Sequence, residues 1–344
     1  MQKLTRDKYI KARDFIFTNA DDVNRAWFRY HFEDGNADKF MNALAKYQHD
    51  NGGFGGLSDE FEYQGPCLKC TEIAIGYILG LNEKPLGDHP VIQRIMAYLL
   101  EQYIPAIGNW GEPFVPEIND HPHCHWSRYR GSTPPPMADD EERIKKYDAN
   151  EKVCFAAFVA RYSEIVPHEL HDEIIKYPVE HLLQYWDQNI PTYCVGNVYE
   201  FEYFLAFVPC LKDRVLVDKL TAILRQNPAA FWELDFTKSD TDYVHLPCVS
   251  PSSIIYPAVK DLADKALTYR IQQQSDDGKW PLGWSYGKSD EMRRLEAKND
   301  VIRTVNMLVL LKQSGRIEVK CHKHFSHSCS PYNDAHITPR LSVR

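Results

Sequence analysis

Apolar residues recur at intervals of three and four along most of the chain, the spacing that places them on one face of an α-helix. Alternation of apolar and polar residues, which is typical of strands, is nowhere sustained. We therefore predict an all-α protein. The pattern predicts helices over residues 5–19, 21–33, 36–50, 67–81, 90–103, 148–164, 167–188, 196–210, 213–226, 257–274 and 299–313.

Two of these segments, 67–81 and 148–164, are apolar on almost every side. A helix that is apolar all round is buried among other helices, so we expect these two to be inner helices. The two helices within residues 1–35 are amphipathic and are expected to cap the rest. After residue 320 the apolar periodicity stops, and residues 321–344 are predicted to be an irregular tail.

A glycine-rich motif occurs twice between predicted helices. Residues 47–56 are Tyr-Gln-His-Asp-Asn-Gly-Gly-Phe-Gly-Gly, and residues 272–280 are Gln-Gln-Gln-Ser-Asp-Asp-Gly-Lys-Trp. We call them the first and the second corner. Both place glutamine, a short polar linker, glycine and an aromatic residue in the same order. This order predicts a helix that stops at a glycine with positive φ, an aromatic anchor (Phe54 or Trp280), and a glutamine that bridges the backbone of neighbouring helix ends.

On these two corners the chain resembles the terpenoid cyclase and protein prenyltransferase superfamily, whose squalene-hopene cyclase-like Gln-Trp repeats mark the corners of an α/α toroid. The resemblance covers residues 36–313. It implies a single toroid domain over residues 1–320, built from about five to six helical hairpins. It also implies an axial cavity that holds an isoprenoid or another hydrophobic small molecule.

Composition narrows the classes of partner. A net charge of -8 gives no basic surface for nucleic acid, and no apolar run reaches the roughly 18 residues of a membrane span. The charged N-terminal residues do not resemble a secretory signal, so we expect a cytoplasmic protein with a small-molecule ligand; its oligomeric state stays open. The nine cysteines are scattered and odd in number, which favours reduced thiols. Cys67 and Cys70 form a Cys-x-x-Cys motif without a second pair, which favours core residues over a zinc site.

The densest group of titratable residues lies in the proline-rich connector at 105–147, which is longer than a passive link requires. If the segment is extended, its three histidines share one side, where they could act as acids and bases or hold a divalent metal; no cofactor is otherwise predicted. The alternative is that these histidines only bond the loop in place. The candidate catalytic residues here are Asp120, His121, His123 and His125, and Glu117 and Trp126 are candidate substrate-binding residues.

Two further groups complete the candidate site. Glu60 and Tyr63 follow the first corner, and we assign Glu60 a catalytic and Tyr63 a substrate-binding role. The third group contains Asp242 and Tyr243, again as catalytic and substrate-binding candidates. The segment Asp240-Thr241-Asp242-Tyr243 is an incomplete form of the Asp-x-Asp-Asp motif with which the resembled cyclases protonate an alkene. By contrast, the acidic run at 139–142 is expected to be a solvated charge run.

Three functions remain open. The resemblance implies a lyase, cyclase or transferase that starts its reaction with an acid and stabilises cations on aromatic faces. A carbohydrate-active enzyme, either a glycoside hydrolase or a lyase, could instead use Glu60 and Asp120 as paired carboxylates. The third possibility is a ligand-binding module without catalytic activity.

Overall fold

The computed structural model describes residues 1–131, 139–145, 147, 149–186, 195–236 and 246–318. This part of the chain is mainly helical, with helices α1 to α12 and two short antiparallel strands, Tyr103–Ile104 (β1) and Asn109–Trp110 (β2). The predicted helical class is thereby confirmed. Among the described residues, no helix has both the length and the apolar character that a membrane crossing requires.

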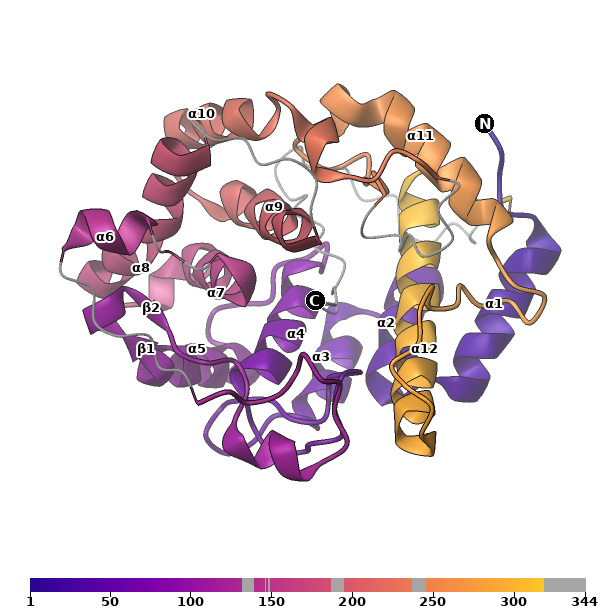
Figure 1. Ribbon diagram of the computed structural model, residues 1–344, viewed down its shortest axis with the longest axis horizontal. Helices are drawn as coiled ribbons and strands as arrows, with labels where there is room; N and C mark the ends of the chain where they lie inside the picture. The colour runs from indigo at the N-terminus through magenta and orange to yellow at the C-terminus, as the bar shows by residue number, and fades with distance from the viewer. Residues whose placement is uncertain (132–138, 146, 148, 187–194, 237–245, 319–344) are drawn as a thin grey trace. The chain divides into compact units, whose positions relative to one another are not determined.

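The chain divides into two compact units, which are described separately. Among the described residues, the first contains residues 1–46 and those from 232 to 318, and the second contains those from 47 to 231. In the first unit, α12 packs against α1 and α2, and α2 packs against α3 (Figure 1). The helices of this unit are α1 (Arg6–Asn19), α2 (Asp22–Phe32), α3 (Ala37–Ala45), α11 (Tyr256–Gln272) and α12 (Asp290–Gln313).

Two predicted helix boundaries in the first unit are wrong. Helix α12 begins at Asp290, nine residues before the predicted start, because Ser289 caps it by accepting a hydrogen bond from the Met292 amide and acidic residues fill its first turn. These early turns are charged and largely exposed, so they carry no apolar periodicity. Helix α3 ends at Ala45, five residues early, because the first corner already begins at Tyr47.

The second unit contains helical hairpins. Helices α4, α7 and α9 lie side by side, and α7 packs against both neighbours (Figure 1). Helices α5, α8 and α10 lie along the outer side of these three helices. All twelve residues of α4 are buried, as are residues 151–160 of α7, which confirms that these are inner helices. The six helices are α4 (Leu68–Leu79), α5 (Pro90–Gln102), α7 (Asn150–Arg161), α8 (His168–His181), α9 (Val195–Phe207) and α10 (Arg214–Leu224).

The long connector between α5 and α7 is more regular than predicted. It contains the β1–β2 pair and the 3-10 helices η1 (Pro105–Ile107) and η2 (Pro116–Asp120). The acidic run at 139–142 leads into the short helix α6 (Asp140–Lys145), and Asp139, Asp140 and Glu141 are exposed, as expected of a solvated charge run. Its acidic residues fill the first turn, where the helix dipole favours negative charge. The remaining short elements are η3 (Ser163–Ile165), η4 (Leu182–Trp186), η5 (Val208–Cys210) and η6 (Pro228–Phe231).

The two corners have the predicted hydrogen bonds. Gln48 Nε2 donates to the Gly52 carbonyl of its own corner at 3.0 Å and to the Val91 carbonyl of α5 at 3.2 Å. Gln274 Nε2 donates to the Gly278 carbonyl at 2.7 Å and to the Lys8 carbonyl of α1 at 3.0 Å. Each glutamine thus joins its corner to the first turn of another helix in the same unit.

The corner glycines are required for two reasons. Gly52 and Gly278 have φ values of +90° and +97°, which residues with a Cβ rarely adopt. A Cβ on Gly52 would also lie 2.1 Å from the Arg94 carbonyl oxygen of α5, and a Cβ on Gly278 would lie 2.5 Å from that of Lys11 in α1. The neighbouring helix therefore packs directly on the glycine in both corners.

The aromatic anchors are buried, as predicted. Phe54 and Trp280 are 0% and 1% exposed, and their backbone amides donate to the hydroxyls of Thr71 in α4 and Thr304 in α12, the helices that follow the two corners. The indole of Trp280 also donates to the Arg270 carbonyl at 2.6 Å.

Candidate functional site

The structure brings together two of the three predicted groups, because the loop after the first corner pairs with the end of the long connector. The Cys124 amide donates to the Glu60 carbonyl at 2.8 Å, and the Glu62 amide donates to the Pro122 carbonyl at 2.9 Å. Phe61 and His123 form an antiparallel bridge between these bonds. The two loops therefore form one irregular ribbon in the second unit. The third group, Asp242 and Tyr243, lies outside the described residues.

The imidazoles and acidic side chains of the connector lie toward solvent. The ring of Tyr63 contacts that of His121 at a centroid distance of 5.4 Å, and His125 contacts Trp126 at 4.7 Å. His123 Nδ1 is bonded to the His121 carbonyl at 2.7 Å. Glu117, Asp120, His121 and His125 are exposed, whereas Tyr63, His123 and Trp126 are half-buried. In the described part of the chain, no group of three or more His, Cys, Asp or Glu side chains is placed to hold a metal ion, so His121, His123 and His125 do not form such a site.

Glu60 differs from the other candidates because its side chain lies beneath this ribbon. It is fully buried, and the Ser127 hydroxyl donates to Oε2 at 2.5 Å. Burial, reinforced by the neighbouring Asp59 carboxyl, raises the pKa of Glu60 to about 8, although the charge of Lys69 opposes this. At neutral pH Glu60 is therefore mainly a neutral acid that holds a proton.

Three more ionisable residues lie in the interior of the second unit. Lys69 and Glu72 are on α4, and Glu151 is on α7. The Lys69 ammonium is 3.2 Å from a carboxylate oxygen of each glutamate, and all three side chains are at most 6% exposed. Tyr203 of α9 donates to Glu72 Oε1 at 3.3 Å. We call Glu60, Lys69, Glu72 and Glu151 the acid cluster.

The charges of the acid cluster decide its protonation. Burial by itself would lower the pKa of Lys69, but the carboxylates of Glu72 and Glu151 outweigh burial and raise it, so the ammonium keeps its charge. Burial raises the pKa of Glu72 to about 7, and the adjacent Lys69 limits that rise. Glu72 and Glu151 thus share the Lys69 ammonium in a place where an unpaired charge is costly. At neutral pH Glu60 therefore stays mostly protonated, and Glu72, with its pKa of about 7, is close to half protonated.

Sequence reasoning identified Glu60 but missed Lys69, Glu72 and Glu151. Lys69 and Glu72 interrupt a helical segment that is otherwise largely apolar, and they are three residues apart, on one helix face. Charged residues at buried helical positions were the available signal. The sequence around Glu151 on α7 does not indicate its pairing with Lys69, because that contact depends on how α4 and α7 pack.

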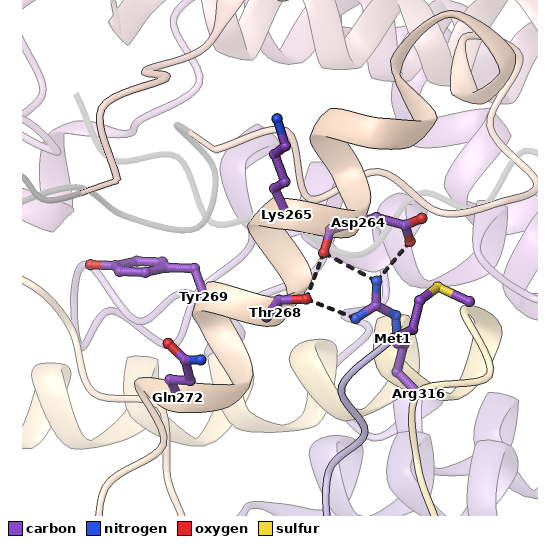
Figure 2. A pocket seen from close by; sticks show the side chains of 7 residues that line it. All are labelled: Met1, Asp264, Lys265, Thr268, Tyr269, Gln272 and Arg316. Carbon is purple, nitrogen blue, oxygen red and sulfur yellow. Dashed lines mark hydrogen bonds and ion pairs between the residues drawn. The ribbon is translucent and has the colours of Figure 1, made fainter.

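A cavity of about 380 Å³ in the first unit has a structural explanation. It is lined by residues of α11, by Met1 and by Arg316 (Figure 2). The buried Arg316 guanidinium donates to Asp264 Oδ1 at 2.7 Å, to the Thr268 hydroxyl at 3.0 Å and to the Gln2 carbonyl at 3.1 Å. These bonds join the N-terminal segment to α11 and to the end of α12. Because the Arg316 guanidinium already donates to groups of the protein itself, this cavity is a weaker candidate for a ligand site than the acid cluster.

No protein-family model matches the chain, and a comparison with curated proteins finds no similar sequence. The functional argument therefore rests on the residues of the site.

Proposed function

We propose that the second unit carries a general-acid site, in which Glu60 gives a proton to a largely apolar small molecule. The observation that carries this proposal is the neutral, buried Glu60 carboxyl, fixed by Ser127 and raised in pKa to about 8. General acids work best when their pKa lies near the working pH, because the acid form is then both populated and able to give up its proton. Buried carboxyl groups with a raised pKa are concentrated at functional sites.

The pKa of Glu60 also bears on what it protonates. Protonation of an alkene produces a carbocation, which is a far stronger acid than a carboxylic acid with a pKa of about 8. Protonation of an epoxide, ether or alcohol oxygen during bond cleavage requires a weaker acid. We therefore favour an oxygenated isoprenoid, opened or cyclised after proton transfer to oxygen. Phe61, packed edge-on against Phe114 at 6.1 Å, supplies apolar surface next to Glu60 in the sequence.

The α/α toroid is part of the same proposal. Its support is the alternation of inner and outer helices in the second unit and the equivalence of the two corners. In the first unit, α1 has the same relationship to the second corner that α5 has to the first corner in the second unit. Helix α1 is therefore suited to continue the series of hairpins after α12.

The carbohydrate-active alternative needs two carboxyl groups that flank one open site. Glu60 is fully buried, whereas Asp120 is exposed, so the two carboxyl groups differ sharply in environment. This difference favours the single-acid proposal over a paired-carboxylate mechanism.

The test measures turnover of an epoxide of farnesol and of a panel of oligosaccharides, with products detected by mass spectrometry. Under the proposal, Glu60→Gln lowers turnover of the epoxide by about 100-fold or more, the usual contribution of a general acid. The matched variant Asp120→Asn stays near wild type. Equal losses in both variants on an oligosaccharide would support paired carboxylates. Binding of the epoxide without turnover in the wild type would favour a ligand-binding module.

A further inference from the structure

The Cys-x-x-Cys motif lies at the beginning of α4, in a geometry that the proposed acid chemistry does not use. Cys67 is the N-cap residue, with extended backbone angles of φ -150° and ψ 160°, and Cys70 is the third residue of the helix. The Cys70 amide donates to Cys67 Sγ at 3.4 Å, and the two thiols are hydrogen-bonded to each other. Both are reduced and fully buried. The two sulfur atoms therefore already face each other.

The spacing of the two cysteines suits a disulfide. Residues three apart on a helix have Cβ atoms about 5–6 Å apart, and a disulfide needs a Cβ separation of about 3.5–4.5 Å. The two cysteines therefore need to approach each other by only a small distance. Cys67 is the N-cap residue, so its own amide takes part in no hydrogen bond within the helix, and its backbone can adjust without breaking one. The Cys67 amide bonds instead to the Phe54 carbonyl of the first corner at 3.0 Å.

We infer that Cys67 and Cys70 form a reversible disulfide by exchange with a small disulfide such as oxidised glutathione, which makes the first turn of α4 a redox-sensitive element. Cys67 Sγ, as the thiolate, attacks one glutathione sulfur, and the first glutathione leaves and takes up the Cys67 proton. Cys70 Sγ then attacks the sulfur of Cys67 in the mixed disulfide, and the second glutathione leaves with the Cys70 proton. The two cysteines are oxidised, and one molecule of glutathione disulfide is reduced to two thiols.

The buried surroundings give the reduced pair no stabilisation as a thiolate. Burial and the neighbouring Cys70 raise the pKa of Cys67 well above that of an ordinary thiol. Strongly oxidising disulfides are easily reduced because their reduced form is stabilised, and this pair lacks such stabilisation by a thiolate. The same burial makes exchange slow, because the sulfur is both shielded and rarely ionised.

Closure of the disulfide would act on Lys69, which lies between the two cysteines. The same turn is fixed to the first corner, since Thr71 Oγ1 accepts from the Phe54 amide and donates to the Cys67 carbonyl at 2.9 Å. A change in this turn therefore reaches both the first corner and the Lys69 ammonium of the acid cluster. This inference does not depend on the proposed function, because thiol exchange is measured without any substrate.

The experiment incubates the folded full chain for several days in a mixture of oxidised and reduced glutathione, followed by acid quenching, unfolding and alkylation. Peptide mass spectrometry then counts the alkylated cysteines. We expect the peptide with Cys67 and Cys70 to lose both alkylation sites together, with a mass lower by two hydrogens, and dithiothreitol to restore them. Cys154, buried on α7 without a neighbouring cysteine in the sequence, is the internal control and is expected to stay alkylated.

Two variants separate the pair from general oxidation. Cys67→Ser keeps a hydrogen-bond acceptor at the N-cap position, where serine is favoured, so α4 is expected to remain folded. Cys70→Ser retains Cys67 alone. In neither variant should the peptide with a mass lower by two hydrogens, which marks the disulfide, be detected. The incubation with the glutathione mixture is repeated in mild urea, which promotes local opening. If both cysteines of the wild type are still fully alkylated afterwards, the inference is overturned. A separate glutathione on each cysteine would also overturn it.

Discussion

Gln48 and Gln274 make the same pair of hydrogen bonds, one within their own corner and one to the first turn of another helix. Gln48 joins Gly52 to Val91 of α5, and Gln274 joins Gly278 to Lys8 of α1. In both cases the glycine four residues after the glutamine is covered by that same helix. The amide group of each glutamine thus donates both to a carbonyl of its own corner and to a first-turn carbonyl of the neighbouring helix, where the second lone pair of the oxygen accepts it.

Replacement of Gln274 by leucine is expected to destabilise the protein by about 1–3 kcal/mol, because the carbonyls of Lys8 and Gly278 lose their shared donor. The free energy of unfolding in urea measures this change. Gln272 is the matched control: it is exposed and bonds only to the Gln2 side chain, so Gln272→Leu should change stability by less than about 0.5 kcal/mol. Equal losses in the two variants would contradict a bridging role.

Trp280 is expected to contribute more than the glutamine. Trp280→Ala removes a large, fully buried side chain and is predicted to cost about 3–5 kcal/mol. Trp280→Phe keeps most of the volume but loses the bond to Arg270, so its cost should be lower. Urea unfolding of both variants gives the comparison, and the half-exposed Leu234→Ala serves as control. Unchanged stability in Trp280→Ala would argue against an anchor.

The corners could be predicted from the sequence because their determinants are local. Glycine, glutamine and aromatic residue lie within seven positions of one another, and each acts through conformation or hydrogen bonding near that point. The start of α12 could not be predicted from apolar spacing, because its first turns are charged and solvent-facing. Its signal was the cap at Ser289, followed by Asp290 and Glu291.

The candidate site was only partly predictable, because its contacts are distant in sequence. Glu60 was named for its neighbourhood of acidic and aromatic residues. No local pattern connects it to Ser127, whose hydroxyl fixes its carboxyl group. The closely spaced histidines predicted a site on the side of the connector that is exposed in the structure. The burial of Glu60 depends instead on how the loop after the first corner pairs with the connector, which no local pattern indicates.

The stability of the protein is expected to fall as pH rises through the range in which Glu60 ionises. Its pKa is about 8 in the folded state against 4.5 ordinarily, so the folded state binds more protons between these values. The favourable contribution is complete below pH 4.5 and is lost as pH approaches 8; it amounts to at most about 5 kcal/mol. Glu72, with a pKa of about 7, contributes with the same sign.

Glu60→Gln tests this pH dependence, since the amide keeps the shape of the neutral acid but cannot ionise. We expect the variant and the wild type to be similarly stable at about pH 4, below the ordinary pKa of the carboxyl group, and the variant to be the more stable at pH 9, with free energies taken from urea unfolding. Glu117→Gln, on the exposed side of the connector, is the control and should follow the wild type. A variant that is less stable than the wild type at pH 9 would contradict a neutral Glu60.

Lys69 is expected to be the residue of the acid cluster whose loss costs most. Lys69→Met removes the one ammonium that the carboxylates of Glu72 and Glu151 share at 3.2 Å. Loss of one partner from a buried ion pair costs about 3–5 kcal/mol, because the remaining charge has neither water nor counter-ion. The loss should be smaller at pH 5 than at pH 8, since the glutamates can then take up protons.

The pair of Lys84 and Glu164 provides the control for this prediction. Its atoms are closer, at 2.7 Å, but both side chains are more than a third exposed. Lys84→Met should therefore cost no more than about 1 kcal/mol, because solvent screens an exposed pair. The double variant Lys69→Met with Glu151→Gln should recover part of the loss at pH 8, since it removes one of the two stranded carboxylates. If Lys69→Met proves no more damaging than Lys84→Met at pH 8, the Lys69 ammonium does not hold Glu72 and Glu151 as carboxylates, and the buried ion pairs contribute no more than an exposed one.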